Sequence, residues 1–164
     1  MNSIRPTNFY SDNQIHIWYK MDRSFLIPKS SIYINFFSPY MRTNTKDLFC
    51  VEIFYNYIRY IIDFTFSDAK DAGNEINIIN NENGITIMLN CYSDVVDRII
   101  YRIFDLLYGD LIDESTFNQM KLMSNDVLES SRHAQPFEKI FLLFSKIIKE
   151  NIFIYSDMQQ VYTS

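Results

Sequence analysis

The stretch FLIPKSSIYINFFSPY, residues 25–40, is the clearest structural signal in the sequence, because it alternates like a strand and has a proline near each end. Successive side chains of a strand point to opposite faces of a sheet. One face carries Ile32, Ile34 and Phe36. The other face includes Tyr33 and Phe37, so it is partly apolar as well. We predict a strand over residues 31–37 whose isoleucine face anchors a sheet on its helices.

Three further strands are predicted, one before this strand in the sequence and two after it. Residues 14–20 alternate between apolar and polar positions, whereas residues 1–12 show no regular pattern. Residues 75–80 and 85–91 also alternate, and the turn between them ends in Asn83-Gly84. Because Asn-Gly between two strand-like runs is a strong hairpin signal, we expect these two strands to be neighbours.

A long amphipathic helix is predicted between the strand at residues 31–37 and the hairpin. Apolar and polar positions recur there at helical spacing over residues 44–68. The apolar positions are Leu48, Val51, Tyr55, Ile58 and Ile62, and the polar ones are Glu52, Asn56, Arg59 and Asp63. Either Asn44 or Thr45 is expected to cap the start, and Ala72-Gly73 closes the segment.

Three more helices are predicted after the hairpin. One begins at Ser93 or Asp94 and ends at Gly109; the next begins near residues 113–115. The last opens at Pro136, whose missing N–H needs no partner in a first helical turn. The apolar positions expected to pack are Val96, Ile99, Ile100, Ile103 and Leu107 in the first helix, Phe117, Met120, Val127 and Leu128 in the second, and Phe137, Ile140, Phe141, Phe144, Ile147 and Ile148 in the third.

The resulting order, β-β-α-β-β-α-α-α, is typical of an α+β fold. Strand pairs separated by a long helix predict two layers, a mostly antiparallel sheet with helices packed on one face. No linker, repeat or low-complexity tract divides the chain, so residues 1–164 are interpreted as a single domain.

Composition excludes several classes of function. The net charge of −5 and the lack of a Lys/Arg cluster argue against nucleic acid as a partner. The polar N-terminus and the absence of a long apolar run argue against a secretion signal or a membrane span. Cys50 and Cys91 lie in apolar runs, which predicts free buried thiols in a reducing compartment. We therefore expect a soluble, cytoplasmic protein.

Residues that carry chemistry are few and scattered. His16 and His133 lie far apart in the sequence, and neither belongs to an HExxH or HxxEH pattern. Cys50 and Cys91 have no histidine nearby to activate a thiolate. The acidic residues gather at predicted helix starts and turns, where solvation explains them: Asp94, Asp97, Asp110, Asp113 and Glu114. We predict no catalytic, cofactor-binding or metal-ligating residue in this chain.

The aromatic residues are more distinctive, at 16% of the chain. Most are expected in the core. Trp18, Tyr33 and Phe37 could instead form a face packed against another domain or polypeptide, because exposed aromatic surface marks interaction sites.

An ordered set of motifs resembles the third domain of the insulin-degrading enzyme-like (insulinase, M16) family of zinc metallopeptidases. The matching motifs are Pro6-Thr7-Asn8-Phe9, Ile17-Trp18-Tyr19-Lys20, Phe25-Leu26-Ile27-Pro28-Lys29, Asn35-Phe36-Phe37-Ser38-Pro39, Ala69, Ala72-Gly73, Tyr92, Asp94, Arg132 and Gln135-Pro136. They stay in order from residue 6 to about residue 150, so the resemblance covers most of the chain. Two positions depart from the family pattern: Asn74 replaces a leucine, and Cys91 replaces a glycine.

The resemblance implies a non-catalytic middle domain in a longer, four-domain zinc metalloendopeptidase. In that family the HxxEH zinc motif belongs to the first domain, and four domains enclose a chamber in which peptides are degraded. The third domain helps to wall this chamber and contacts the other domains. Because none of the zinc ligands is matched here, no zinc is expected in this chain and no activity from it alone. The third domain of the family continues past the point where this chain stops, so the resemblance also implies that the chain is a fragment of its parent protein.

Two other functions stay open at the level of the sequence. One is a stand-alone module whose aromatic sheet face binds a protein partner. The other is an inactive subunit resembling those of mitochondrial processing peptidase, which would pair with a separate zinc-bearing chain.

Overall fold

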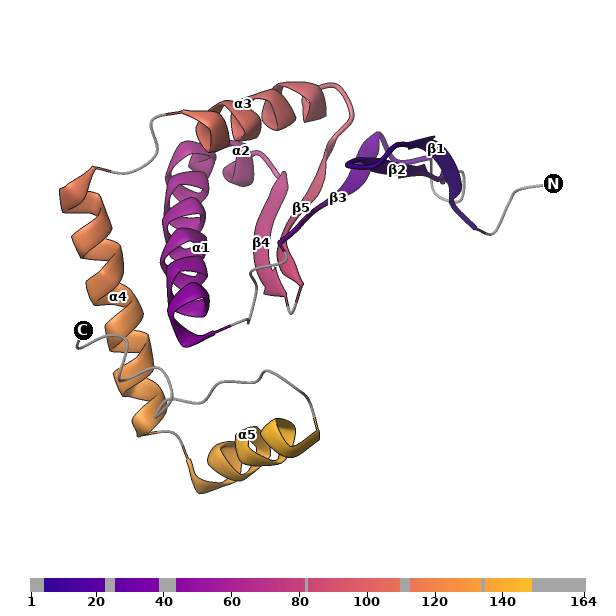
Figure 1. The fold of residues 1–164 in the computed structure, drawn as a ribbon. Coiled ribbons are helices and arrows are strands. Elements are labelled where there is room, and N and C mark those ends of the chain that lie inside the picture. Colours follow the sequence, from indigo (N-terminus) through magenta and orange to yellow (C-terminus); the bar gives the residue numbers. More distant parts are fainter. Residues whose placement is uncertain are drawn as a thin grey trace.

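A computed structural model describes residues 5–22, 26–38, 44–81, 83–109, 113–133 and 135–148. The elements, in order, are β1 (Thr7–Ser11), β2 (His16–Tyr19), β3 (Lys29–Phe37), α1 (Thr45–Thr65), α2 (Ser67–Asp71), β4 (Glu75–Asn81), β5 (Gly84–Tyr92), α3 (Val96–Tyr108), α4 (Glu114–Arg132) and α5 (Pro136–Ile148). Helices α1 and α3 lie over one side of the strands, and α4 and α5 extend away from them (Figure 1). The predicted α+β fold is confirmed, with β1 and α2 as additional short elements.

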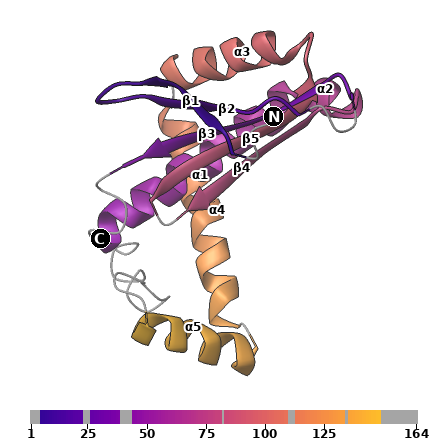
Figure 2. The ribbon, with the colours of Figure 1, turned by 90° about the vertical axis from the view of Figure 1, so that its right-hand side faces the viewer.

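The sheet is antiparallel in the order β3-β5-β4, and its register follows the predicted alternation. Ile32 pairs with Leu89, which pairs with Ile76 on its other side. The next row of side chains on the same face of the sheet joins Ile34 of β3, Ile87 of β5 and Ile78 of β4. Figure 2 shows that this sheet crosses α1 and leaves its other side without a helix. The isoleucine face therefore packs on the helices, as the alternation of residues 31–37 predicts.

The hydrophobic core surrounds α1, which packs on the sheet, α3 and α4. Its buried side chains are Phe49, Ile53, Tyr57, Ile58, Ile62, Phe66, Ile76, Ile87, Leu89, Cys91, Ile99, Ile103 and Met120. Asn44 caps α1, because its Oδ1 accepts a hydrogen bond from the Asp47 N–H at 2.8 Å. The buried arc of α1 is wider than the predicted stripe, since the sheet covers one side of this helix and α4 covers another.

The prediction that residues 1–12 are irregular is wrong, because Thr7–Ser11 forms β1 and pairs with β2. Asp12 explains the turn: its Oδ1 accepts the backbone N–H groups of Gln14 at 2.7 Å and Ile15 at 2.6 Å. These hydrogen bonds hold the pKa of the Asp12 carboxyl below its usual range. An aspartate that bonds the backbone two or three residues later is a recognised turn signal, so the hairpin was detectable in the sequence.

The predicted side-chain cap of α3 by Ser93 or Asp94 is also wrong. The residue before the helix is Val95, and no side chain caps it. Ser93 instead ties β5 to β3: its N–H donates to the Pro28 carbonyl at 3.0 Å, and its hydroxyl lies 2.9 Å from that of Ser30.

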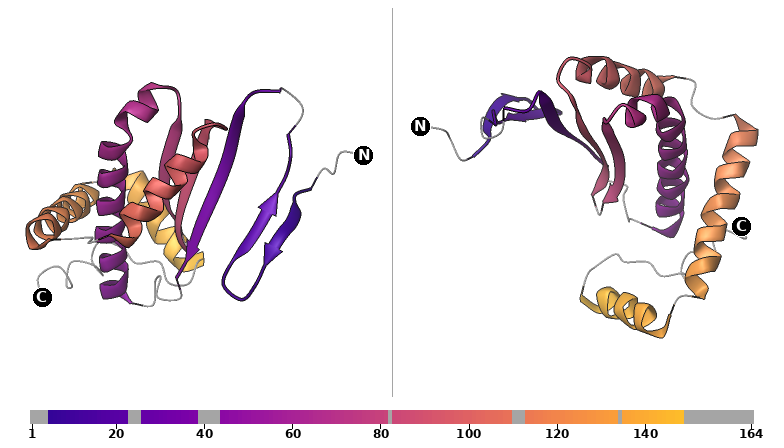
Figure 3. Two further views of the ribbon diagram at one scale, coloured as in Figure 1. Left: turned by 90° about the horizontal axis from the view of Figure 1, so that it is seen from above. Right: turned by 180° about the vertical axis from the view of Figure 1, so that it is seen from behind.

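The last two helices are only partly packed against the rest of the domain. Met120 and Ser124 on α4 are buried against α1, whereas Phe117 and Val127 of the predicted stripe are 42% and 58% exposed. Viewed from behind, α5 stands apart from the sheet (right panel of Figure 3). No helix formed by the described residues is both long and apolar enough to cross a membrane.

Candidate interaction surfaces

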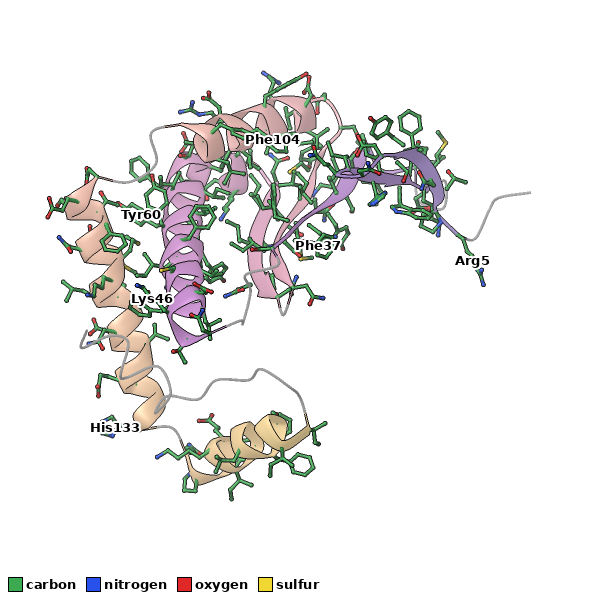
Figure 4. All side chains as sticks on the ribbon, viewed as in Figure 1. Arg5, Phe37, Lys46, Tyr60, Phe104 and His133 are labelled. Atoms are coloured by element: carbon green, nitrogen blue, oxygen red, sulfur yellow. The ribbon has the colours of Figure 1, made fainter. Side chains whose placement is uncertain are left out.

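The two histidines do not meet. His16 is exposed on β2, where its Nδ1 lies 2.6 Å from the Ser11 hydroxyl. His133 lies at the far end of α4, and its backbone N–H donates to the Ser130 carbonyl (Figure 4). Across the described ranges, no group of three or more His, Cys, Asp or Glu side chains is placed to hold a metal ion.

The two cysteines differ in their exposure to solvent. Cys91 is fully buried, and burial raises the pKa of its thiol, so it stays protonated and is a poor nucleophile. Cys50 is exposed on α1, which contradicts the expectation that both thiols are buried. Both are free cysteines in the described structure.

Of the acidic residues singled out in the sequence, Asp97, Asp113 and Glu114 lie at helix starts in the described structure. Asp113 Oδ1 accepts the Thr116 N–H at 2.6 Å just before α4, and this bonding lowers the pKa of Asp113. Asp97 Oδ1 accepts the Arg98 N–H, and Glu114 lies in the first turn of α4. Asp94 is exposed just before α3, and Asp110 lies outside the described residues.

A polar link that the sequence pattern did not reveal joins β4, α1 and α4. Glu52 Oε2 accepts a hydrogen bond from Asn80 Nδ2 at 3.2 Å, and Asn56 Nδ2 donates to Ser124 Oγ at 3.0 Å. Helical spacing places Glu52 and Asn56 on the polar face of α1, but β4 and α4 cover that face in part. Burial raises the pKa of the Glu52 carboxyl, against the opposing hydrogen bonds from Asn80 and Asn56.

Glu52→Gln is expected to stabilise the domain at pH 7 and to change it little at pH 4. The folded state binds the Glu52 proton more tightly than the unfolded chain does. Stability from this group is therefore greatest below the usual glutamate pKa of 4.5 and falls as pH rises through the higher folded value. Glutamine keeps an acceptor for Asn80 without the charge. Urea denaturation of both proteins across this pH range measures the difference.

Glu75→Gln is the matched control, because Glu75 also accepts an asparagine amide, from Asn90 at 3.2 Å, but is exposed. We expect little change in stability from it. Equal pH dependence of the two variants would contradict the role of burial at Glu52.

The structure leaves three apolar surfaces open. The first is the outer sheet face, on the side away from α1, where Tyr33 is 63% and Phe37 is 77% exposed. Figure 4 shows Phe37 on this side and Phe104 on α3. The second is the β1–β2 hairpin, with Phe9 77% and Trp18 63% exposed. All three aromatic residues singled out in the sequence, Trp18, Tyr33 and Phe37, are thus exposed and not core.

The third open surface is the α5 stripe. It consists of Phe137, Ile140, Phe141, Leu143, Phe144, Ile147 and Ile148, all at least half exposed. At 100° per residue these side chains fall within an arc of about 160°. The helical period was predicted correctly for this segment, but the expectation that its stripe packs inside the domain is wrong for the described residues.

Polar side chains cross the outer sheet face between its aromatic residues. Asn81 Nδ2 donates to Thr86 Oγ1 at 2.5 Å, and the Thr86 hydroxyl donates to Asn35 Oδ1 at 2.6 Å, joining all three strands. This face therefore combines amides and aromatic rings with little charge.

Asn74 and Cys91, the two residues that depart from the family pattern, lie close to each other, and both fit the fold. Asn74 is buried; its Nδ2 donates to the Ala69 carbonyl at 2.9 Å, and its Oδ1 accepts the Tyr92 N–H at 3.0 Å. Asn74 thus ties the end of α2 to the end of β5. Cys91 fills the neighbouring buried position, with its Sγ 3.8 Å from the Glu75 carbonyl oxygen.

Together, the fold and these surfaces define a two-layer α+β domain with extensive open apolar surface. The family model described as the middle or third domain of peptidase M16 matches residues 2–161. The chain therefore belongs to the M16 peptidase family, as a middle domain.

Individual relatives agree with this assignment. Human nardilysin is 24% identical over 102 residues, which are 62% of this chain and 9% of nardilysin. The Schizosaccharomyces pombe protein mug138, described as a zinc protease, is 21% identical over 116 residues, or 71% of this chain and 12% of that protein. The crystal structure of pitrilysin matches 99% of this chain with a TM-score of 0.85 at 13% identity, which confirms the fold.

The chain spans about a tenth of the length of these curated relatives, 12% of mug138 and 9% of nardilysin. It covers 17% of the pitrilysin chain.

Proposed function

We propose that residues 1–164 are a non-catalytic middle domain of a longer, four-domain insulinase-type zinc metalloendopeptidase. The zinc ion and the catalytic residues would belong to the first domain of the parent protein. This domain would form part of the wall of the chamber that encloses peptide substrates, and it would contact other domains of the same polypeptide. The free thiols of Cys50 and Cys91 fit a cytoplasmic parent protein.

The observation that carries this proposal is the open α5 stripe. Soluble proteins rarely expose apolar patches larger than a few hundred Å², and larger ones mark interaction sites. A helix of 13 residues with seven large apolar side chains at least half exposed is not stable as a solvent-facing element. In a polypeptide as long as the relatives, a neighbouring domain would cover it.

The outer sheet face supports the role of chamber wall. No described helix covers it, and it presents amide groups and aromatic rings instead of a charged, solvated surface. Such a face can contact many peptide sequences through hydrogen bonds and apolar contacts without selecting one.

Measurements of zinc content and peptide cleavage test the proposal first. The isolated chain is expected to bind no stoichiometric zinc and to cleave no peptide, whereas the natural-length protein binds one zinc ion and does cleave. Elemental analysis and a fluorogenic peptide assay measure both. Stoichiometric zinc or cleavage by the isolated chain would overturn the proposal, as would a natural-length protein that ends near Ser164.

The role of the α5 stripe is tested in the natural-length protein with Phe141→Lys. Activity is expected to fall about tenfold or more while zinc stays bound, because a charge in a buried interface costs several kcal/mol. Lys139→Glu is the matched control, since it changes a charge on the same helix outside the stripe. Equal loss in both variants would contradict an interface at the stripe.

A further inference from the structure

The turn between β4 and β5 contains the one Asn-Gly pair of the sequence, Asn83-Gly84. Asparagine is chemically labile, and an asparagine followed by glycine is especially prone to deamidation, because glycine has no side chain to shield its backbone nitrogen. Asn83 is exposed, whereas Gly84 is buried and begins β5. A reactive pair therefore lies at a turn on which the register of the sheet depends.

Odd-numbered residues of β5, and Asn83 before it, point their backbone groups toward β3. The Ser93 N–H donates to the Pro28 carbonyl at 3.0 Å. At the other end of the strand, the Ser38 N–H donates to the Asn83 carbonyl at 3.1 Å. The register between these two hydrogen bonds is continuous. The Asn83 carbonyl is thus held by the chain that follows β3.

Even-numbered residues of β5 point toward β4, because the direction alternates along an antiparallel strand. Tyr92 agrees with this rule, since its N–H donates at 3.0 Å to Oδ1 of Asn74, the residue before β4. The Gly84 N–H therefore faces Asn81, its partner in the register. The nitrogen that would attack the Asn83 amide is turned into the ladder.

Strand β3 closes the other side of Gly84. A Cβ atom at residue 84 would clash with the backbone carbonyl of Phe36 and would lie 3.1 Å from the Phe37 Cα. Deamidation requires the Gly84 nitrogen to reach the Asn83 side chain. A residue packed between two strands cannot make this movement unless one of the strands separates.

We propose that Asn83 is a modification site that reacts only in chains whose β3-β5-β4 sheet has opened. The Gly84 nitrogen then bonds to Cγ of Asn83 and gives up its proton, while the Cγ–Nδ2 bond breaks and ammonia leaves. Water opens the resulting succinimide ring at either carbonyl and leaves aspartate or isoaspartate at residue 83. This inference goes beyond the proposed function and does not depend on it, because only the turn takes part.

The two products differ in their effect on the fold. Aspartate keeps the path of the chain, and Asp-Gly suits the same kind of turn as Asn-Gly. Isoaspartate adds a carbon to the backbone and removes from the main chain the carbonyl to which Ser38 donates. Gly84 has no room to shift against Phe36, so an isoaspartate chain cannot close the sheet in register. The reaction therefore marks opened chains irreversibly.

Mass spectrometry of the turn tests the protection. The natural-length protein is incubated at neutral pH, either folded or in guanidinium chloride that unfolds it. Deamidation of Asn83 is expected to be at least about tenfold slower in the folded protein, because it requires a rarely populated open state. A peptide of residues 80–88 in both solutions corrects for the effect of denaturant on the chemistry. Equal rates in the folded protein and the peptide would overturn the proposal.

A destabilised variant tests whether opening of the sheet controls the rate. Ile103→Ala truncates a completely buried side chain, and Tyr101→Ala, the control, truncates an exposed one on the same helix. Without denaturant, the first is expected to deamidate at Asn83 at least about threefold faster than the unsubstituted protein, and the second at the same rate. Equal rates in all three proteins would contradict control by opening.

The fate of the products tests irreversibility. Asn83→Asp reproduces the aspartate product and is expected to fold like the unsubstituted protein; failure to fold would overturn this part of the proposal. In aged protein, brief proteolysis removes opened chains. The surviving chains are expected to contain isoaspartate at residue 83 at a level about threefold or more below that before proteolysis, with aspartate unchanged. An isoaspartate level that proteolysis does not change would overturn the irreversible marking.

Discussion

Gly84→Ala is expected to destabilise the domain by more than about 4 kcal/mol, enough to prevent a stable native state. Gly84 has φ of +154°, a conformation that L side chains rarely adopt. A Cβ atom there would lie 1.8 Å from the Phe36 carbonyl oxygen and 2.8 Å from its carbon. Because these are backbone atoms of the neighbouring strand, the clash is relieved only by separating β3 from β5. Urea denaturation followed by circular dichroism measures the loss.

Gly73→Ala separates the steric effect from backbone strain. Gly73 also has positive φ, +86°, but the nearest atoms to an added Cβ are side-chain atoms of Tyr92 at 3.8 Å and beyond. Only strain remains, and the expected cost is about 1–3 kcal/mol. Equal losses in the two variants would contradict the close approach of Phe36 to Gly84.

The second large effect is expected from Ile103→Ala, at about 2–5 kcal/mol. Ile103 is completely buried and lines a small apolar pocket between α1 and α3, so truncation enlarges an existing gap. The cost combines lost burial with the cavity that remains, because close-packed surroundings relax only in part. Thermal and urea unfolding both report it.

Tyr101→Ala is the control on the same helix. Tyr101 is 75% exposed, and its removal is expected to change stability by less than about 0.5 kcal/mol. A loss at Ile103 no larger than that at Tyr101 would mean that α3 is not anchored to α1 through this position.

Local signals in the sequence were sufficient for most elements. The alternation around Ile32 and Ile34, the Asn83-Gly84 turn and the Asn44 cap each depend on neighbours within a few residues, and all three are confirmed. β1 was missed because its pairing depends on the short turn at Asp12 and not on an alternating pattern of its own.

Contacts between segments that lie far apart in the sequence could not be predicted from local patterns. Hydrophobic spacing identifies an apolar face but not the surface that covers it, so the α5 stripe looked like core. The same limit applies to Glu52 and Asn56, which look solvent-facing until β4 and α4 are placed beside them. The two histidines, His16 and His133, lie apart in the described structure. The prediction that this chain has no catalytic site stays a prediction.

The pairing of β3 with β5 also bears on how fast the domain folds. Ser30 and Ser93, whose hydroxyls meet across these strands, are 63 positions apart, and α1 and the β4–β5 hairpin lie between them. Closing so long a loop carries an entropic cost before the contacts form, whereas the hairpin needs only a tight turn. We therefore expect the hairpin and α1 to associate early and β3 to add late. A newly synthesised chain would meanwhile hold an aromatic strand unpaired on both sides, and such a strand is prone to aggregation until β5 pairs with it.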